Sequence, residues 1–172
     1  MTFEILPERP DDDALIDPLL DRTFGPDRRA RTVYRLRDGI APQAGLSFAA
    51  VDPAATLLAS LRFWPIAIED RAAILLGPLV VEPELQGRGI GRALVAHGVR
   101  EARRLGHGIC VVVGEPGYYG PYGFASAPAA GLHLPGPVEP RRFLVAELSA
   151  GTLEGVTGMI GQAAPALRAV PM

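Results

Sequence analysis

A glycine-rich segment in the middle of the chain has the residue types of an anion-binding loop. It runs from Gln86 to Arg92, with glycines at positions 87, 89 and 91. A glycine has no Cβ, so the backbone there can approach a ligand closely and adopt positive φ. The segment also opens a helical pattern, which leaves several N–H groups unpaired at the positive end of a helix dipole. We therefore predict a phosphate or pyrophosphate site, with Arg88 and Arg92 adding charge at its rim.

Two familiar phosphate-binding motifs do not match this segment. A dinucleotide-binding loop has the spacing Gly-x-Gly-x-x-Gly directly after a first strand. Here the spacing is Gly-x-Gly-x-Gly, and several strand-like segments come before it. All 17 basic residues are Arg, so the Lys of a Walker-type loop is missing, and so is the Lys that a Schiff base needs. A tight glycine turn without a ligand is the structural alternative.

The loop lies between two apolar segments that read as buried strands. Residues 72–81 are almost entirely apolar, and Ile109 to Val113 is a β-branched run around Cys110. The segment between them predicts a helix that starts near Gly89 and ends at Gly106. Strand, helix and strand at this spacing predict a right-handed unit with parallel strands. The pair Gly77-Pro78 cannot lie in an unbroken ladder, so we expect a bulge or splay there.

The remaining pattern predicts an antiparallel meander with helices before it. Carboxylates at positions 11–13 favour the start of a first helix, which Gly25 ends, and Pro65 predicts a bend or an edge position in its strand. The expected strands are residues 3–6, 46–51, 57–68, 129–134 and 143–148; the expected helices are 11–24 and an Arg-rich one at 27–37. We expect the last dozen residues to be disordered.

Bulk composition favours one soluble, cytoplasmic domain. The chain has 172 residues, a net charge of −2 and 48% hydrophobic residues. Acidic and basic residues are interspersed, so no nucleic-acid partner is expected. No apolar stretch is long enough for a membrane span, and the acidic N-terminus lacks a secretory core. The one cysteine cannot form an internal disulfide, as is usual in a reducing compartment.

Two motifs together resemble the GNAT superfamily of N-acetyltransferases. The segment from Leu79 to Gly91, LVVEPELQGRGIG, is similar to the family's acetyl-CoA motif, Gln/Arg-x-x-Gly-x-Gly/Ala, after a strand ending in Val-x-Pro. Tyr119 to Phe124 resembles the family's Tyr-x-x-x-Gly-Phe. The resemblance extends over about residues 3–150 and is strongest to a bacterial branch of small predicted N-acetyltransferases.

The resemblance implies an α/β fold with a mixed, mostly antiparallel sheet that is flanked by helices and splayed at the acetyl-CoA site. Residues 1–150 would form a single acetyltransferase domain, and 151–172 a partly irregular extension. The pantetheine arm would enter the splay and pair with backbone of the preceding strand. The implied acetyl-CoA-binding residues are Leu79, Val80, Val81, Gln86, Gly87, Arg88, Gly89, Ile90, Gly91 and Arg92.

The resemblance also implies direct acetyl transfer from acetyl-CoA to a primary amine of a small molecule or peptide, without a metal. Tyr119 would protonate or hydrogen-bond the departing CoA sulfur, and its alternative role is packing under the sheet. The general base stays open, because the strand before the splay has no carboxylate; the candidates are Glu69, Glu82, Glu115, His133 and a water chain. The Asn that many relatives have after the next strand is also missing.

Two other functions stay open at this stage. The same fold, without an identified base, would serve as an acyl-CoA-binding or sensing protein. A phosphate-binding domain for another nucleotide is the third possibility. The acceptor wall is expected near residues 24–31 and 134–142, where several arginines favour an acidic acceptor only weakly, since Arg is the chain's sole cation. We expect a monomer or homodimer.

Overall fold

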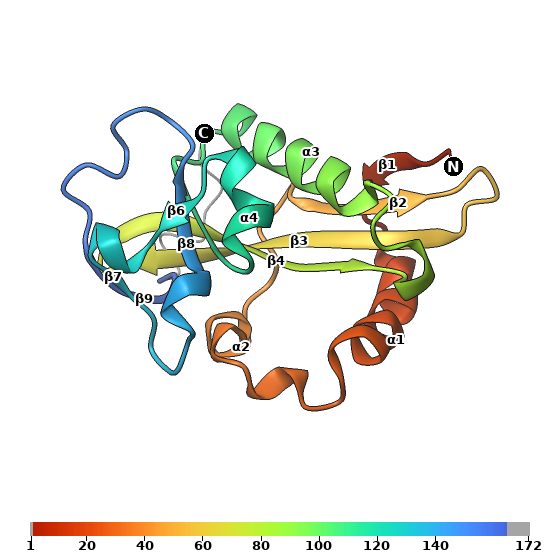
Figure 1. The fold of residues 1–172 in the computed structure, drawn as a ribbon, viewed down its shortest axis with the longest axis horizontal. Coiled ribbons are helices and arrows are strands. Elements are labelled where there is room, and N and C mark those ends of the chain that lie inside the picture. The colour runs from red at the N-terminus through yellow and green to blue at the C-terminus, as the bar shows by residue number, and fades with distance from the viewer. Residues whose placement is uncertain (1, 165–172) are drawn as a thin grey trace.

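The computed structural model describes residues 2–164, and its centre is a twisted, mixed sheet (Figure 1). Within these residues nine strands are present, and the main path has the order β1-β2-β3-β4-β5-β8-β6. All pairings along this path are antiparallel except β4 with β5. The strands are β1 Glu4–Pro7, β2 Ser47–Val51, β3 Leu57–Ile68, β4 Arg71–Val81, β5 Ile109–Val113, β6 Ala125–Ser126, β7 Leu132–His133, β8 Phe143–Glu147 and β9 Gly158–Gln162.

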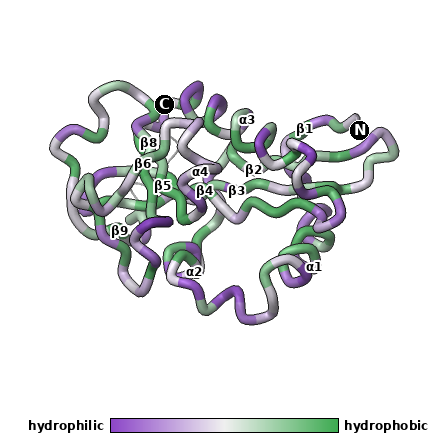
Figure 2. The backbone as a smooth tube through the Cα atoms, in the orientation of Figure 1, coloured by the Kyte–Doolittle hydropathy of each residue, from purple (hydrophilic) through white to green (hydrophobic). Residues whose placement is uncertain are grey.

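Helices cover both faces of this sheet. Helix α3 lies on one face, whereas α1 and α2 lie on the other (Figure 1). The helices are α1 Asp13–Phe24, α2 Thr32–Arg37, α3 Ile90–Arg104 and the short α4 Pro116–Tyr119. Alternate residues of β4 therefore enter different clusters: Ile74 and Leu76 pack on the α3 side, and Leu75 and Val80 on the opposite side. Figure 2 shows that β3 and β4 are largely apolar, as strands buried on both faces must be.

The predicted splay lies in the middle of β4. Leu61 pairs with Leu79 and Phe63 with Leu76, so two residues of β4, Gly77 and Pro78, face the single Arg62 of β3. This arrangement is a β-bulge, which bends the strand that carries the extra residue. The parallel pairing of β4 with β5 includes only Ile74 with Cys110 and Leu75 with Val111. Beyond that point the two strands separate and leave space between them.

Most predicted elements are confirmed, including the parallel strand–helix–strand unit. Pro65 lies within β3 between its pairing with β2, which ends at Arg62, and its pairing with β9, which starts at Ile66. Its missing N–H therefore falls where β3 has no strand partner on that side. The long helix α3 packs closely on the sheet, because a Cβ on Gly98 would lie 2.6 Å from the ring of Phe63. Of the described helices, none is long and apolar enough to cross a membrane.

Three predictions of secondary structure were wrong. The Arg-rich helix is broken: a 3-10 turn at Arg28–Ala30 is separated from α2 by Arg31, whose ψ is 145°. The strand expected at 129–134 is mostly a 3-10 turn, and only Leu132–His133 pairs.

The third error concerns the end of the chain. Strand β9 was not predicted, because its glycines hide the apolar alternation, yet it pairs with both β3 and β7. The expected disorder of the last dozen residues is therefore wrong for residues 161–162, and positions 165–172 lie outside the described residues.

Candidate active site

The gap between β4 and β5 opens into a cavity of about 1060 Å³. Its walls come from the glycine-rich loop and first turn of α3, the bulge of β4, the end of β5 with α4, the segment from α1 to α2, and the loop before β8. Strands of the sheet thus form one side of the cavity, and four separate loop and helix segments surround its opening. Figure 2 shows that the connection from α1 to α2 is hydrophilic, so the cavity joins an apolar floor to a polar rim.

The glycine loop has the geometry that its sequence predicts. Gly87 and Gly89 have φ values of 81° and 88°, which L side chains rarely adopt. A Cβ on either residue would meet no atom within 4 Å, so these positions border open space. Helix α3 begins at Ile90 directly after Gly89, and its first N–H groups therefore point toward that space. Backbone donors and a helix dipole arranged in this way are able to bind an anion.

Eight of the ten predicted cofactor-binding residues line the cavity. They are Leu79, Val81, Gln86, Gly87, Gly89, Ile90, Gly91 and Arg92. The other two do not line it. The side chain of Val80 is 1% exposed and packs against Leu19 and Leu20 of α1, because alternate residues of a strand face opposite sides. Arg88 is exposed in the loop and lies outside the lining.

Tyr119 lines the cavity and is almost fully buried. Its side chain is 8% exposed, and its ring makes edge contacts with Tyr118 and Phe124. A Cβ on Gly114 would lie 2.3 Å from the ring of Tyr119, so only glycine allows the tyrosine to sit against the end of β5. Burial raises the pKa of the Tyr119 phenol well above its usual value.

Tyr118 also lines the cavity, but from a different place. Its hydroxyl would lie 2.6 Å from a Cβ on Gly91, next to Leu79 and Val81. The guanidinium of Arg92 lies over the Tyr118 ring, 4.6 Å from its centroid. Burial raises the pKa of this phenol too. The Tyr118 hydroxyl therefore lies by the start of α3, whereas Tyr119 is more fully buried and lies against the end of β5. The third tyrosine, Tyr122, hydrogen-bonds the carbonyl of Arg92 and is outside the lining.

The Acetyltransferase (GNAT) family model matches residues 15–116, which is more than half of the chain. This match includes the bulge of β4, the glycine loop, α3 and β5. The chain belongs to the GNAT family of acetyltransferases.

Similar proteins include GNAT enzymes that have been crystallised with CoA. The uncharacterized N-acetyltransferase YhbS of Escherichia coli K12 is 32% identical over 156 residues, which cover 89% of this chain and 92% of YhbS. The crystal structure of E. coli YhbS in complex with CoA is similar with a TM-score of 0.80 and 30% identity, covering 93% of this chain and 89% of that one. A GNAT acetyltransferase from Brucella melitensis in complex with acetyl-CoA has a TM-score of 0.60 and 27% identity, covering 83% and 94%. The expected fold class is thereby confirmed.

Of the four side chains considered as general base for a GNAT reaction, only Glu115 lines the cavity. The carboxylate of Glu115 forms ion pairs with Arg141 at 2.8 Å and Arg142 at 3.3 Å. The hydrogen bond from Arg141 lowers the pKa of Glu115, which makes it a weaker base.

The other three candidates are engaged or placed elsewhere. Glu69 is in the turn after β3 and accepts a hydrogen bond from the Met159 N–H. Glu82 pairs with Arg22 at 2.8 Å, and His133 is exposed on β7, outside the cavity lining. Within residues 2–164 no group of three or more His, Cys, Asp or Glu side chains could hold a metal ion.

The acceptor wall expected for a GNAT enzyme is only partly where the sequence placed it. Phe24, Arg28 and Arg31 line the cavity from one side, and Leu134 and Arg142 from the other. Arg29 and Arg141 do not line it. Thr32 joins the two sides, because its hydroxyl donates a hydrogen bond to the carbonyl of Pro137.

Sequence reasoning missed the four α2 residues that line the cavity, which include Tyr34 and Arg37. The spacing of three residues between these two on a helix was the available signal, since such residues share one face.

Proposed function

We propose that this protein is an acetyl-CoA-dependent N-acetyltransferase that transfers the acetyl group directly to a primary amine. The observation that carries this proposal is the cavity at the splay of β4 and β5, which joins an anion-binding helix start to a buried phenol. The related structures with CoA and acetyl-CoA support the same cosubstrate here. The open space beside Gly87 and Gly89 has room for a phosphate group.

In the proposed arrangement, backbone N–H groups from Gly87 to Arg92 hold the pyrophosphate of CoA. The pantetheine arm lies along Leu79 and Val81 as an added strand would, because β5 has turned away there. A backbone N–H of β4 at the splay, of Val81 or its neighbour, polarises the thioester carbonyl. Acetyl-CoA supplies the activated acyl group, and the chain's residues supply position, charge and protons.

The proton balance of the transfer is simple. The amine nitrogen forms a bond to the carbonyl carbon, and the bond from that carbon to sulfur breaks. Tyr119 donates its proton to the leaving sulfur, since burial keeps the phenol protonated. The amine loses one proton, which returns to the phenolate through water, so the products are an N-acetyl amine and CoA thiol. Because Glu115 is held by two arginines, we assign proton relay to water rather than to that carboxylate.

A catalytically weak acyl-CoA-binding protein of the same fold is the second candidate. One observation favours it. Among the described residues that line the cavity, the carboxylates are those of Glu115 and Glu139, and each is paired with an arginine. Such a protein would bind acetyl-CoA without releasing CoA when amines are added.

Two measurements test the proposal. Thermal unfolding should shift upward with CoA but not with ATP or NAD, because only CoA has an arm that fills the gap between β4 and β5. Acetyl-CoA with a panel of primary amines should then release CoA thiol over many turnovers, with the acetylated amine identified by mass spectrometry. Stabilisation without turnover on any amine would instead support the binding protein, and stabilisation by ATP or NAD alone would overturn both.

A further inference from the structure

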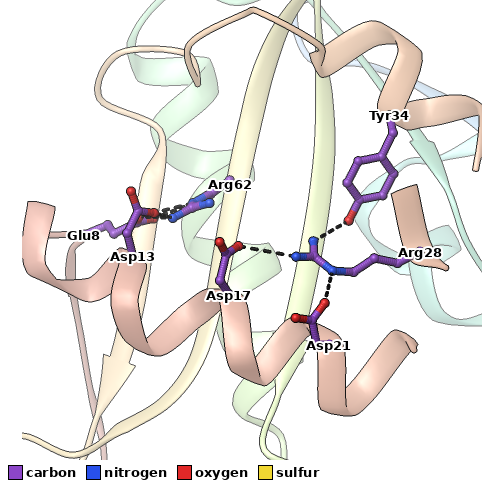
Figure 3. Close-up of polar contacts among 7 residues, drawn as sticks. All are labelled: Glu8, Asp13, Asp17, Asp21, Arg28, Tyr34 and Arg62. Atoms are coloured by element: carbon purple, nitrogen blue, oxygen red, sulfur yellow. Dashed lines mark hydrogen bonds and ion pairs between the residues drawn. The ribbon is translucent and has the colours of Figure 1, made fainter. Parts of the chain in front are cut away.

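Arg28, Arg37 and Arg62 are near enough for the first and last to disfavour the charge on Arg37. Arg28 and Arg62 are neutralised by acids of the N-terminal segment. Arg28 is 3% exposed and bonds Asp21 at 2.8 Å and Asp17 at 3.4 Å (Figure 3). Arg62 bonds Glu8 and Asp13 in the same way (Figure 3). Each of these cations therefore has two carboxylates. Removing a guanidinium from water is costly unless such partners are present.

The third arginine, Arg37, has no such partner. Among residues 2–164 no carboxylate lies within ion-pair distance of it, and its Nε is buried without a hydrogen-bond partner. Its guanidinium lies against two aromatic rings, 4.8 Å from the Tyr34 centroid and 5.7 Å from that of Trp64. Burial lowers the pKa of Arg37 to about 10; Tyr34 opposes this shift, and the nearby Arg28 and Arg62 add to it. At neutral pH it remains a cation, and within residues 2–164 it has no carboxylate partner.

This charge lies in the wall of the cavity, beside the bulge of β4. Arg37 lines the cavity, and its Nη2 would lie 3.0 Å from a Cβ on Gly77 in the bulge of β4. The indole N–H of Trp64 donates to the carbonyl of Gly77 at 2.7 Å, which fixes the bulge beside the guanidinium. Tyr34 accepts a hydrogen bond from Arg28 at 2.9 Å, which fixes the ring next to Arg37. The arginine is thus held in place, with its charge toward the cavity.

We propose that Arg37 binds a carboxylate of the acceptor, so that the substrate is a small amine that carries a carboxylate close to its amino group. The anion would supply the acid partner that Arg28 and Arg62 obtain from the chain itself. An arginine fork matches the two oxygens of a carboxylate. Arg37 lies beside the bulge where β4 and β5 separate, so a short acceptor such as a free amino acid would place its amine in that splay. This inference rests on the proposed acetyl transfer and names its substrate class.

Matched pairs of acceptors test the inference on the wild-type protein. Free L-amino acids and their amides are compared by the rate of CoA release at pH 8. The amide has the larger fraction of neutral amine at that pH, so amine basicity alone favours the amide. We expect the acids to have the higher kcat/KM, by about tenfold or more. Equal rates for acids and amides would overturn the carboxylate site while leaving acetyl transfer intact.

Variants then assign the effect to Arg37. Arg37→Met should raise KM for the preferred acid by about 10- to 100-fold, the usual worth of a charged hydrogen bond, and leave KM for acetyl-CoA unchanged. Arg37→Lys should recover part of that loss, since it keeps the charge but not the fork. Arg71→Met, which removes an exposed charge at the other end of β4, is the control. A variant Arg37→Met with unchanged KM for the acid would contradict the assignment.

Binding without turnover separates this inference from the proposed function. If no amine releases CoA, acetyl transfer fails, and calorimetry of the CoA-saturated protein with the same acids and amides decides the carboxylate site. The site is supported if the wild-type protein binds the acid but not the matching amide, and if the Arg37→Met variant no longer binds the acid. No difference between acid and amide would overturn it. If Arg37→Met does not fold, Arg37→Lys and the wild-type comparison give the same decision.

Discussion

Two neighbouring phenols line the same cavity, and their surroundings assign them different roles. Tyr118 has its hydroxyl against Gly91 at the start of α3, where we place the pyrophosphate and pantetheine. Tyr119 is more deeply buried, against Gly114 at the end of β5. The spacing to Gly123-Phe124 selects Tyr119 from the sequence alone, but only the fold shows that both rings reach the cavity.

Replacing the deeper phenol tests its assigned role. Tyr119→Phe should lower kcat by about 10²-fold, the usual contribution of a general acid, with KM for acetyl-CoA nearly unchanged. Tyr122→Phe is the matched control, since Tyr122 is on the same loop and outside the cavity lining. Initial rates of CoA release measure both variants. Full activity in Tyr119→Phe, or an equal loss in the control, would refute the role of Tyr119.

The pH dependence of turnover provides a second test at this scale. A phenol with the usual pKa near 10 begins to lose its proton, and hence its acid function, as the pH approaches 10. Burial raises the pKa of Tyr119, so its protonated form persists to higher pH. We therefore expect kcat to show no alkaline decline up to about pH 10. A decline near pH 9 that Tyr119→Phe abolishes would contradict this.

Arg28 acts at the scale of elements, because it joins α1 and α2, which both contribute to the cavity wall. Its guanidinium bonds Asp17 and Asp21 of α1 and Tyr34 of α2 (Figure 3). This buried side chain accounts for the break that sequence reasoning missed: the 3-10 turn directs Arg28 toward α1, and the chain starts a new helix after Arg31. Helical periodicity reports the local pattern and not such long-range bonds, so it predicted one continuous helix.

Loss of this link should weaken the fold in a pH-dependent way. Arg28→Met should lower the free energy of unfolding by about 2 kcal/mol, as expected for charged hydrogen bonds of a buried arginine. The hydrogen bond from Arg28 lowers the pKa of Asp21 below its ordinary value of 3.8. The contribution of the Arg28–Asp21 bond to the free energy of unfolding is therefore present above pH 3.8 and is lost as the pH falls below it.

Urea unfolding at several pH values measures this difference. Arg29→Met, a change at the exposed neighbour, is the control and should be near neutral. A wild-type advantage over Arg28→Met that grows on acidification below pH 3.8 would contradict the account.

At the scale of the whole molecule, strand β9, near the end of the described residues, contributes a buried side chain to the core. Ile160 of β9 is fully buried and packs in the cluster beneath β3, whereas its neighbour Met159 is 45% exposed. Ile160→Ala should lower the free energy of unfolding by about 2 to 5 kcal/mol, while Met159→Ala should change it by less than about 0.5 kcal/mol. Denaturant unfolding compares the two. Similar effects of both changes would show that β9 adds little to stability.

The order of elements and the conformation of the glycine-rich loop could be predicted, because they depend on local signals. Apolar runs mark β3, β4 and β5, and Gly77-Pro78 marks the splay within β4. The short β9 could not be predicted, since Gly158 and Gly161 interrupt its pattern and its pairing with β3 spans most of the chain. The site of Arg37 could not be predicted either. Arg37 has no carboxylate partner because the acids of α1 pair with Arg28 and Arg62, which only the fold shows. No sequence signal distinguishes Arg37 from the other arginines.

The most direct test of the central claim is a crystal structure of this protein with CoA. The account predicts that the pyrophosphate lies on the backbone N–H groups of residues 87–92, and that the arm passes between β4 and β5. The CoA sulfur should lie within about 3.5 Å of the Tyr119 hydroxyl, at hydrogen-bonding distance for sulfur. CoA bound outside the splay, or with its sulfur at Tyr118 and remote from Tyr119, would contradict the account.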